Sequence, residues 1–525
     1  MPLSKKITSW VLFILVFITE CVAGYYVCHI KSFIDGDALS RVANAYYVLY
    51  IRPSHLAAIG AVWTPLLSFL EMPLLLLTPI YKPIASSGLA SVFVTSSFAA
   101  GSGVLIFKYT VDYGRSQWTG LCLALLYCFN PFMFLYGCNG MTEVPYCFML
   151  LWFTYNFTQW MENENPDHII KMACALMLSF LIRYEAITAS ISAFLAFTII
   201  ILTFHRKNLE DERRKDLKYS LQCLEGKSLV LLTPVVYAFL VWMIYCWVIM
   251  GNPLYFLNSN YSNLGFVKLY SLNPVLKGMI GKPVLVIKYI VSATVFFMLP
   301  LMVVIIYRII RRTIFKPDFF VLILFVLSAN ILQFVMLSKG ASIGIFRYFI
   351  YPLPFLMAWF PYEMKKNKTK VFTFFCIIIM IIADISLGFS WLRSPVPAMA
   401  GEKFRNFKFV NYPSEIAQRK VVQYINEKIP HAKIMMDAFL TVTTIINCNN
   451  PQHLVITSSY EFKRAIKNPK LYKIDYILVP STITTDPTSM DAFNRYYPNL
   501  YIHGADWCVL EKEFDKGYKL YRIKK

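Results

Sequence analysis

Two acidic side chains flank a single glycine just after the first long apolar run of the chain. They are Asp35 and Asp37, in the string Phe-Ile-Asp-Gly-Asp-Ala-Leu-Ser-Arg. A third acid, Glu143, begins a later apolar run, in Gly-Met-Thr-Glu-Val-Pro. A carboxylate held beside a reacting hydroxyl group can accept its proton, so these acids are candidates for general-base chemistry.

Basic and aromatic side chains occur at comparable places in other apolar runs. Arg183 and Glu185 lie between two such runs in Leu-Ile-Arg-Tyr-Glu-Ala, and Arg347-Tyr348 begin another in Phe-Arg-Tyr-Phe-Ile-Tyr-Pro. Trp63, in Trp-Thr-Pro, is an aromatic candidate in an outer segment. Guanidinium groups suit phosphate oxygens, and charges placed beside long apolar runs usually mark function.

Each candidate also has a purely structural explanation. Asp37 would cap a helix over 38–50, and Glu143 would complement the dipole of the helix that it begins. Arg183 and Glu185 would pair with each other, and Trp63 would anchor the chain at a membrane interface. The chemical interpretation is favoured by the order of these residues and by their common side of the membrane, which the topology predicts.

The elements that must position these side chains are membrane helices. Of 525 residues, 57% are hydrophobic and only 15% are charged, and the mean hydropathy is +0.52. This composition excludes a disordered chain, a disulfide scaffold and a soluble globular protein, and the length of the apolar runs excludes a transmembrane β-barrel. We predict eleven spanning helices, at about 10–28, 85–107, 117–136, 143–158, 172–182, 186–204, 228–250, 284–306, 317–337, 349–362 and 371–391.

The distribution of basic residues sets the orientation of these spans. With the N-terminus in the cytoplasm, the inner segments hold 20 Lys and Arg in 72 residues, whereas the outer loops hold 10 in 109. This is the positive-inside pattern, and it puts every candidate residue at the outer face. Residues 57–81 are also apolar, but Pro65 and Pro73 interrupt them. We expect interfacial or re-entrant helices there, within an outer loop over 29–84.

The composition changes after Trp391. We predict a transmembrane domain over 1–391 and a small extracytoplasmic α/β domain over 392–525. In the second domain, 414–429 and 459–467 are expected to be helices, and 433–436, 453–457 and 475–479 are expected to be strands. The predicted fold class is therefore an all-α polytopic membrane domain with a small α/β domain at its C-terminal end.

The net charge of +21 does not indicate a nucleic-acid partner. The inner loops account for the basic excess, and no nucleic-acid-binding motif is present. The twelve cysteines lie mostly inside apolar runs and lack the spacing of metal ligands. We therefore predict no metal site and no nucleic-acid binding.

Taken together, these motifs resemble the GT-C superfamily of integral-membrane glycosyltransferases. The nearest branch contains the dolichyl-phosphate-mannose–protein mannosyltransferases and the bacterial lipid A aminoarabinose transferase. The resemblance covers most of the chain. It rests on Asp35-Gly36-Asp37, Trp63-Thr64-Pro65, Glu143, Arg183-Tyr184-Glu185, Arg347-Tyr348 and the external C-terminal domain. The first-loop acids here read Asp-Gly-Asp, whereas the protein mannosyltransferases have an adjacent Asp-Glu, which puts a protein acceptor in doubt.

The resemblance implies a sugar donor on polyprenyl phosphate and an envelope glycan, lipid or protein acceptor reached from the outer face. Asp35 or Asp37 would be the catalytic base, and the resemblance leaves open which one. Arg347 and Arg183 would hold the phosphate, and Glu143, Glu185, Tyr348 and Trp63 would complete the substrate site. Such a donor lacks a diphosphate, so we expect no metal cofactor. The expected reaction is hexosyl or pentosyl transfer with inversion, at a plasma membrane that we expect to be bacterial.

Two other functions fit a polytopic membrane protein. A transporter or lipid flippase also has many helices and buried charges, but its charges are expected near the midplane of the membrane. A non-catalytic envelope scaffold would use the acids only as helix caps. Uptake without a covalent product would identify a transporter, and an unchanged phenotype after both aspartates are neutralised would identify a scaffold.

Overall fold

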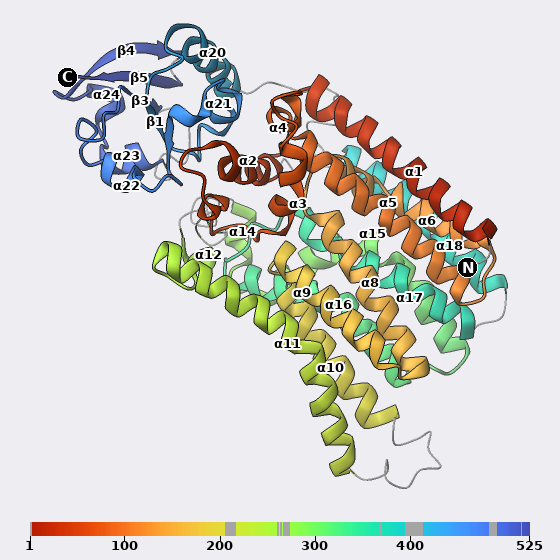
Figure 1. The fold of residues 1–525 in the computed structure, drawn as a ribbon. Helices are drawn as coiled ribbons and strands as arrows, with labels where there is room; N and C mark the ends of the chain where they lie inside the picture. The colour runs from red at the N-terminus through yellow and green to blue at the C-terminus, as the bar shows by residue number, and fades with distance from the viewer. Residues whose placement is uncertain are drawn as a thin grey trace.

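The computed structural model describes residues 3–204, 217–259, 262, 265, 274–366, 370–393, 413–481, 491–515 and 517–524. Long helices lie side by side in one body, and a small sheet flanked by short helices lies at one end of it (Figure 1). The N-terminus lies at the opposite end of the bundle from the sheet. The predicted combination of a helical membrane domain and a small α/β domain is confirmed.

The long helices follow the predicted spans closely. They are α1 (Leu3–Gly24), α5 (Leu89–Asp112), α6 (Gln117–Cys128), α7 (Pro131–Cys138), α8 (Glu143–Asn163), α9 (Pro166–Ile182), α10 (Ala186–Phe204), α11 (Leu217–Met250), α15 (Pro283–Ile310), α16 (Pro317–Ser338), α17 (Pro352–Lys366) and α18 (Lys370–Arg393). Pro131 and the N-cap Asn130 break the span predicted at 117–136 into α6 and α7. These two helices meet at an angle of 67°.

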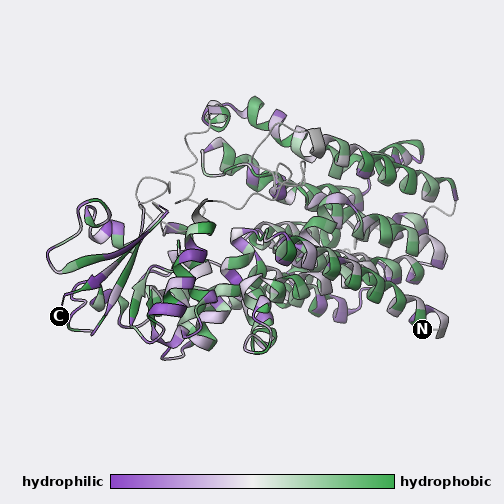
Figure 2. Ribbon diagram, turned by 90° about the horizontal axis from the view of Figure 1, so that it is seen from above, coloured by the Kyte–Doolittle hydropathy of each residue, from purple (hydrophilic) through white to green (hydrophobic). Residues whose placement is uncertain are grey.

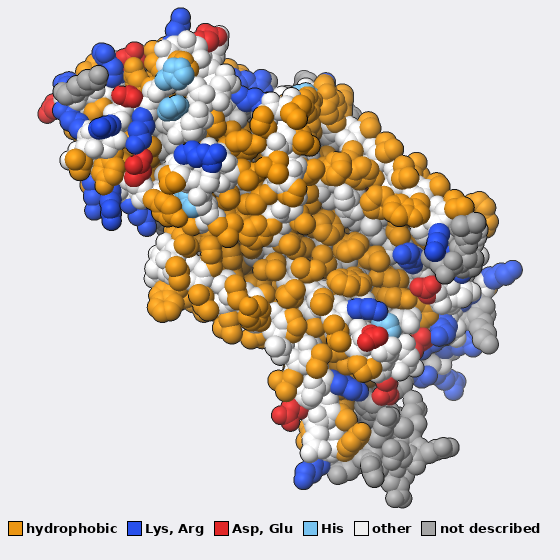
Figure 3. Space-filling view, in the orientation of Figure 1, with side chains coloured by type: hydrophobic (Ala, Val, Ile, Leu, Met, Phe, Trp, Pro, Cys, Tyr) orange, Lys and Arg blue, Asp and Glu red, His pale blue; other side chains and the backbone are white. Residues whose placement is uncertain are grey.

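Among the described helices, seven are long and apolar enough to cross a membrane, and α6 with α7 makes an eighth if the pair is one span. The remaining predicted spans are α8, α9 and α17. Every side chain from Pro352 to Met364 of α17 is buried, so this helix meets protein and not lipid. Apolar side chains form a broad belt around the bundle, and charged ones gather at its two ends (Figures 2 and 3). The chain is therefore a multi-pass membrane protein.

The outer segment between α1 and α5 consists of short helices. They are α2 (Gly36–Tyr50), the 3-10 turn η2 (Leu56–Ile59), α3 (Leu66–Leu75) and α4 (Pro83–Ser86). The ten residues of α3 extend about 15 Å, which is half of a bilayer core. Helix α3 is therefore too short to cross the membrane alone, and the topology stays a prediction.

The C-terminal sheet has five strands in the order β2-β1-β3-β5-β4. The parallel strands β1 (Ile434–Met436), β2 (Leu454–Ile456) and β3 (Tyr476–Pro480) were all expected. The antiparallel strands β4 (Cys508–Phe514) and β5 (Tyr518–Ile523) were not. Residues Val509 to Glu513 are exposed on an edge strand and carry three charges, so they lack the apolar pattern of a buried strand. The helix expected at 459–467 is reduced to α22 (Phe462–Ala465).

The sheet shares a hydrophobic core with α2. Tyr46 and Tyr47 of α2 are buried in one cluster with Val421 of α20 (Pro413–Lys428) and Ile434 of β1. A hydrogen bond and a ring stack reinforce this packing. Lys82 Nζ donates to the carbonyl oxygen of Asn447 at 2.6 Å, and the His55 ring stacks on Tyr460 with centroids 4.1 Å apart. The predicted domain boundary at 391/392 falls at the end of α18, and residues 394–412, which follow it, are outside the described residues.

Candidate active site

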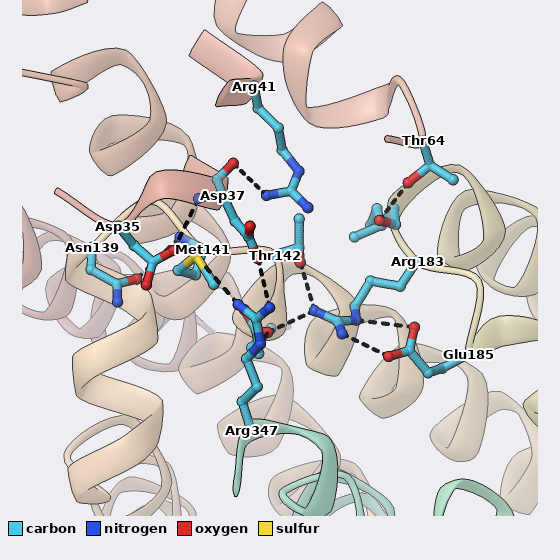
Figure 4. Close-up of polar contacts among 12 residues, drawn as sticks. Asp35, Asp37, Arg41, Thr64, Asn139, Met141, Thr142, Arg183, Glu185 and Arg347 are labelled. Carbon is cyan, nitrogen blue, oxygen red and sulfur yellow. Dashed lines mark hydrogen bonds and ion pairs between the residues drawn. The ribbon is translucent and has the colours of Figure 1, made fainter. Parts of the chain in front are cut away.

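Four chain segments that are far apart in sequence meet at the end of the bundle next to the sheet domain. They are the N-cap and first turn of α2, the start of α8, the turn between α9 and α10, and the 3-10 turn η4 (Phe346–Phe349). Figure 4 shows their side chains converging on one polar cluster. The structure thus brings the predicted acids and arginines together, as their common predicted depth requires.

Asp35 is the N-cap of α2. Its backbone is extended, with φ −69° and ψ 138°, and its carboxylate accepts a hydrogen bond from the backbone N–H of Asp37 at 3.0 Å. The expectation that Asp37 caps this helix is therefore wrong. The helix begins at Gly36, and only the extended residue before it can turn its side chain back to the free N–H groups. Asp37 lies in the first turn, with its carboxylate free for other partners.

The two aspartates have opposite electrostatic environments. Burial raises the pKa of Asp35, and the negative charge of Asp37 raises it further. Burial also raises the pKa of Asp37, but the positive charges of Arg347 and Arg41 outweigh this effect and lower it below the ordinary value. Two carboxylates whose pKa values are driven apart are suited to different roles, one as a proton acceptor and one as a permanent anion.

Arg347 connects the first-loop acids to Glu143. Its Nη2 donates to Oδ2 of Asp37 at 2.6 Å, and its Nε lies 3.5 Å from Oε1 of Glu143. That Nε has no hydrogen-bond partner, and Nη1 faces only the sulfur of Met141, at 3.9 Å. Arg347 therefore keeps donors available although its charge is balanced.

Arg183 lies between two glutamates. Its Nη1 donates to Oε1 of Glu143 at 2.6 Å and to Thr142 Oγ1 at 2.8 Å, and its Nη2 donates to Oε1 of Glu185 at 2.6 Å. Glu143 begins α8 and is completely buried, and its Oε2 has no partner. Burial raises the pKa of Glu185, but Arg183 lowers it by more, so this acid stays ionised.

Aromatic rings support both arginines of this network. The ring of Tyr348 lies 5.9 Å from the guanidinium of Arg183 and 5.6 Å from that of Arg347. The ring of Tyr351 lies 5.8 Å from Arg183. Such cation–π contacts fix the position of a guanidinium without using its N–H donors.

Trp63 contacts Arg41, a residue of the site that the sequence analysis did not identify. Its ring lies 4.7 Å from the guanidinium of Arg41 on α2, and Nη1 of Arg41 donates to the backbone oxygen of Asp37 at 2.8 Å. Arg41 follows Asp37 by four residues, so on a helix both side chains share a face. That spacing in the sequence was the available signal for including Arg41.

The cluster is an array of carboxylates and guanidinium groups without the ligand set of a metal centre. Among the described residues, no three His, Cys, Asp or Glu side chains gather closely enough to hold a metal ion. Whether the reaction needs a divalent metal stays a prediction. The arrangement can accept a proton at Asp35 and stabilise an anionic group at its arginines.

No protein-family model and no curated protein matches the chain. Solved structures do resemble it. The apo oligosaccharyltransferase of Archaeoglobus fulgidus is 12% identical over 89% of this chain and 69% of its own, with a TM-score of 0.39. AglB from the same organism, in complex with an inhibitory peptide and a dolichol-phosphate, is 12% identical over 93% and 70%, with a TM-score of 0.37.

ArnT from Cupriavidus metallidurans, bound to undecaprenyl phosphate, is 10% identical over 98% of both chains, with a TM-score of 0.46. At these identities the likeness concerns the fold alone.

Proposed function

We propose that the protein is a glycosyltransferase that moves a sugar from a polyprenyl-phosphate carrier to an acceptor at the outer face of the membrane. The observation that supports this function best is that one aspartate, which forms no ion pair among the described residues, lies beside a connected array of arginines. Asp35 accepts only a backbone N–H among the contacts of the described residues, whereas Asp37 is paired with Arg347. Transfer from a phosphate-linked sugar needs both a base and a site for the departing phosphate.

In this proposal Asp35 is the base. Its raised pKa makes it a stronger proton acceptor than Asp37, whose charge is held by Arg347 and Arg41. The acceptor hydroxyl gives its proton to Asp35 while its oxygen attacks the anomeric carbon. The bond from that carbon to the phosphate oxygen breaks, and the electron pair leaves with polyprenyl phosphate. One such displacement inverts the configuration of the anomeric carbon.

Arg347 would bind the departing phosphate. Its Nη1 and Nε have no oxygen hydrogen-bonded to them, and the oxygens of a phosphate suit the fork of a guanidinium. Glu143 and Glu185 would hold Arg347 and Arg183 in place, and Tyr348 would support both from one side. Trp63 would support Arg41. These acids are positioning residues in this scheme, because each is already paired with an arginine.

The carrier lipid would lie against the apolar helices, with the N-terminus in the cytoplasm and the sheet domain outside. The acceptor is a glycan, lipid or protein of the cell envelope, and the expected location is a bacterial plasma membrane. The charges lie at the ends of helices and not at their centres, which favours transfer chemistry over transport. The transferred group is a hexose or a pentose.

The test measures release of polyprenyl phosphate by the purified protein in lipid, from a panel of polyprenyl-phosphate hexoses and pentoses, with envelope extract as acceptor. We expect release from one donor, a fall of about 100- to 10,000-fold for Asp35→Asn, and a smaller fall for Asp37→Asn. Activity in excess chelator would support a metal-free reaction. Near-normal turnover of both variants would refute the base assignment, and transport without any covalent product would refute the transferase.

A further inference from the structure

The three arginines of the site differ in how their charges are balanced. Arg183 and Arg347 each lie within 4 Å of two carboxylate groups. Arg41 has no carboxylate within that distance among the described residues. Among the described residues, the only hydrogen bond of its side chain runs from Nη1 to the backbone oxygen of Asp37, and its Nε is buried without a partner. Arg41 is therefore the arginine of the cluster that forms no close ion pair among the described residues, although the charges of Asp37 and Glu143 act on it from a greater distance.

An unpaired buried charge is costly. The side chain of Arg41 is only 4% exposed, so water cannot fully replace a counter-ion. The other acid of this region, Glu71 on α3, is completely buried and makes no hydrogen bond. Burial raises the pKa of Glu71 well above its ordinary value, although Arg41 lowers it. A buried cation without an ion pair destabilises a fold unless a ligand supplies an anion.

The surroundings of Arg41 prepare it for such a ligand. Trp63 covers the face of the guanidinium, which leaves the N–H donors in the plane of the group free. The segment that carries Trp63 is tied to the bundle by Thr64 Oγ1, which donates to the backbone oxygen of Ile182 at 2.6 Å, and by Tyr184 Oη, which donates to that of Val62 at 2.7 Å. Figure 4 shows Arg41 directed at the cluster that contains Asp37 and Arg347.

We propose that Arg41, seated on Trp63, is a principal ligand of the phosphate group of the carrier lipid, opposite Arg347. This inference rests on the proposed function and adds to it a residue outside the motifs that suggested it. Binding the phosphate is expected to stabilise Arg347 only a little, because Asp37 and Glu143 already balance its charge. Arg41 gains a close ion pair that the described residues do not provide, so it is expected to contribute more to affinity.

The test measures binding of a water-soluble short-chain polyprenyl phosphate to the full-length protein in lipid nanodiscs. The corresponding polyprenol and inorganic phosphate are measured beside it, so that recognition of the lipid monophosphate is separated from binding of either half. The variants are Arg41→Gln, Arg41→Lys and Trp63→Leu. Arg52→Gln is the matched control, because Arg52 is an exposed arginine just after the same helix. The melting temperature of each variant is recorded without ligand.

We expect Arg41→Gln to weaken binding of the polyprenyl phosphate by about ten- to a hundredfold. Arg41→Lys should recover part of the loss, because the charge remains but the fork is gone, and Arg52→Gln should bind as the wild type does. Removing an unpaired buried charge should leave the melting temperature unchanged or raise it. If Arg41→Gln does not fold, the test uses Arg41→Lys and Trp63→Leu. Both variants should bind polyprenyl phosphate more weakly than the wild type does.

Two results would overturn the inference, and they are distinguishable. If the wild type binds polyprenyl phosphate and the Arg41 and Trp63 variants bind it equally well, the role of Arg41 is wrong and the proposed function stands. If the wild type binds none of the probes while its melting temperature is normal, the proposed function fails and the role of Arg41 fails with it.

Discussion

Two buried ion networks lie at opposite ends of α17, separated by about 20 Å of helix. The network at the far end joins Arg308 of α15, Asp318 of α16 and Glu363 of α17. Arg308 donates to both oxygens of Asp318, at 3.1 and 2.9 Å, and to Oε1 of Glu363. Trp359 and Lys366 donate to the same acids. Among the described residues, no fully buried side-chain nitrogen or oxygen atom of these three residues lacks a hydrogen bond.

The network at the site is built from the same residue types, but it is incomplete. Glu143 Oε2, Arg347 Nε and Arg41 Nε are all buried without a hydrogen bond. Asp35 carries a raised pKa, and Arg41 has no carboxylate partner. Residue type and burial are therefore alike in the two regions, and the number of unmet donors and acceptors is what separates them.

The difference indicates separate roles. A network whose fully buried polar atoms are all hydrogen-bonded joins three helices and has no buried donor left with which to bind a ligand. A network with unmet donors and acceptors is held in an unfavourable state by the surrounding fold, which is typical of a functional site. Substitutions at the two ends should accordingly change different measured quantities.

The largest expected effect is on stability, from Arg308→Ala. This change leaves Glu363 buried without its cation, and breaking a buried pair in this way costs about 3–5 kcal/mol. The control is Arg311→Ala, one turn further on, where the side chain is exposed and the expected change is within about 0.5 kcal/mol. Thermal unfolding in detergent or nanodiscs measures both.

Arg347→Gln should behave in the opposite way. It should lower the rate of polyprenyl-phosphate release by about tenfold or more while shifting the melting temperature less than Arg308→Ala does. A variant of Arg308 that melts normally but has lost turnover would contradict the division of roles. An Arg347 variant that loses stability but keeps its turnover would also contradict it.

A smaller effect is expected in the pH dependence of turnover. Asp35 must be ionised to accept a proton, so the rate should fall as pH drops through its pKa, which lies above the ordinary value of about 3.9. Asp37 raises that pKa and Arg347 lowers it. Asp37→Asn should therefore move the acidic limb to lower pH, and Arg347→Gln should move it to higher pH. A pH–rate profile of kcat/KM for each variant measures the limb.

Shifts of the acidic limb in the same direction for both variants would exclude Asp35 as the group that titrates. Lys366→Gln is the control. Lys366 belongs to the network at the far end of α17, so this substitution should leave the acidic limb of the profile in place.

The smallest effect is expected at Tyr348. Tyr348→Phe keeps the ring that supports Arg183 and Arg347, so turnover should change by less than about twofold. Tyr348→Leu removes the ring and should reduce turnover by about fivefold, corresponding to a cation–π contact worth about 1 kcal/mol. Equal activity of the Phe and Leu variants would show that the ring does not position the arginines.

The helical part of the fold was predictable from the sequence because apolar length and charge bias are local properties. The break at Asn130-Pro131 was not expected, although an N-cap followed by proline is a recognisable start of a helix. Strand β4 was missed because an exposed edge strand has no apolar run to mark it. Strand β5 is mostly buried between β3 and β4, but its polar residues interrupt the apolar run that would have marked it. Its position depends on pairing with β3, which lies far from it in sequence.

Site residues that stand out against an apolar run were predictable, and Glu143, Arg183 and Arg347 all join one network. Arg41 was not, because it lies in an amphipathic helix where a charge looks ordinary. Glu71 is the single charge of the apolar helix α3, a signal that the sequence analysis did not use. The identity of the cap was also beyond the sequence. Asp35 and Asp37 are equivalent as residue types, and only the extended backbone at Asp35 separates them.

Helix α2 places its first turn in the site and its last turns in the core of the sheet domain. A helix of 15 residues, about 22 Å long, transmits displacement from end to end with little bending. A rotation of the external domain would therefore move Asp37 and Arg41 with it. Force applied to the C-terminal domain, for example by a tethered acceptor, would displace the carboxylate of Asp37. The C-terminal domain is therefore mechanically coupled to the candidate site through α2.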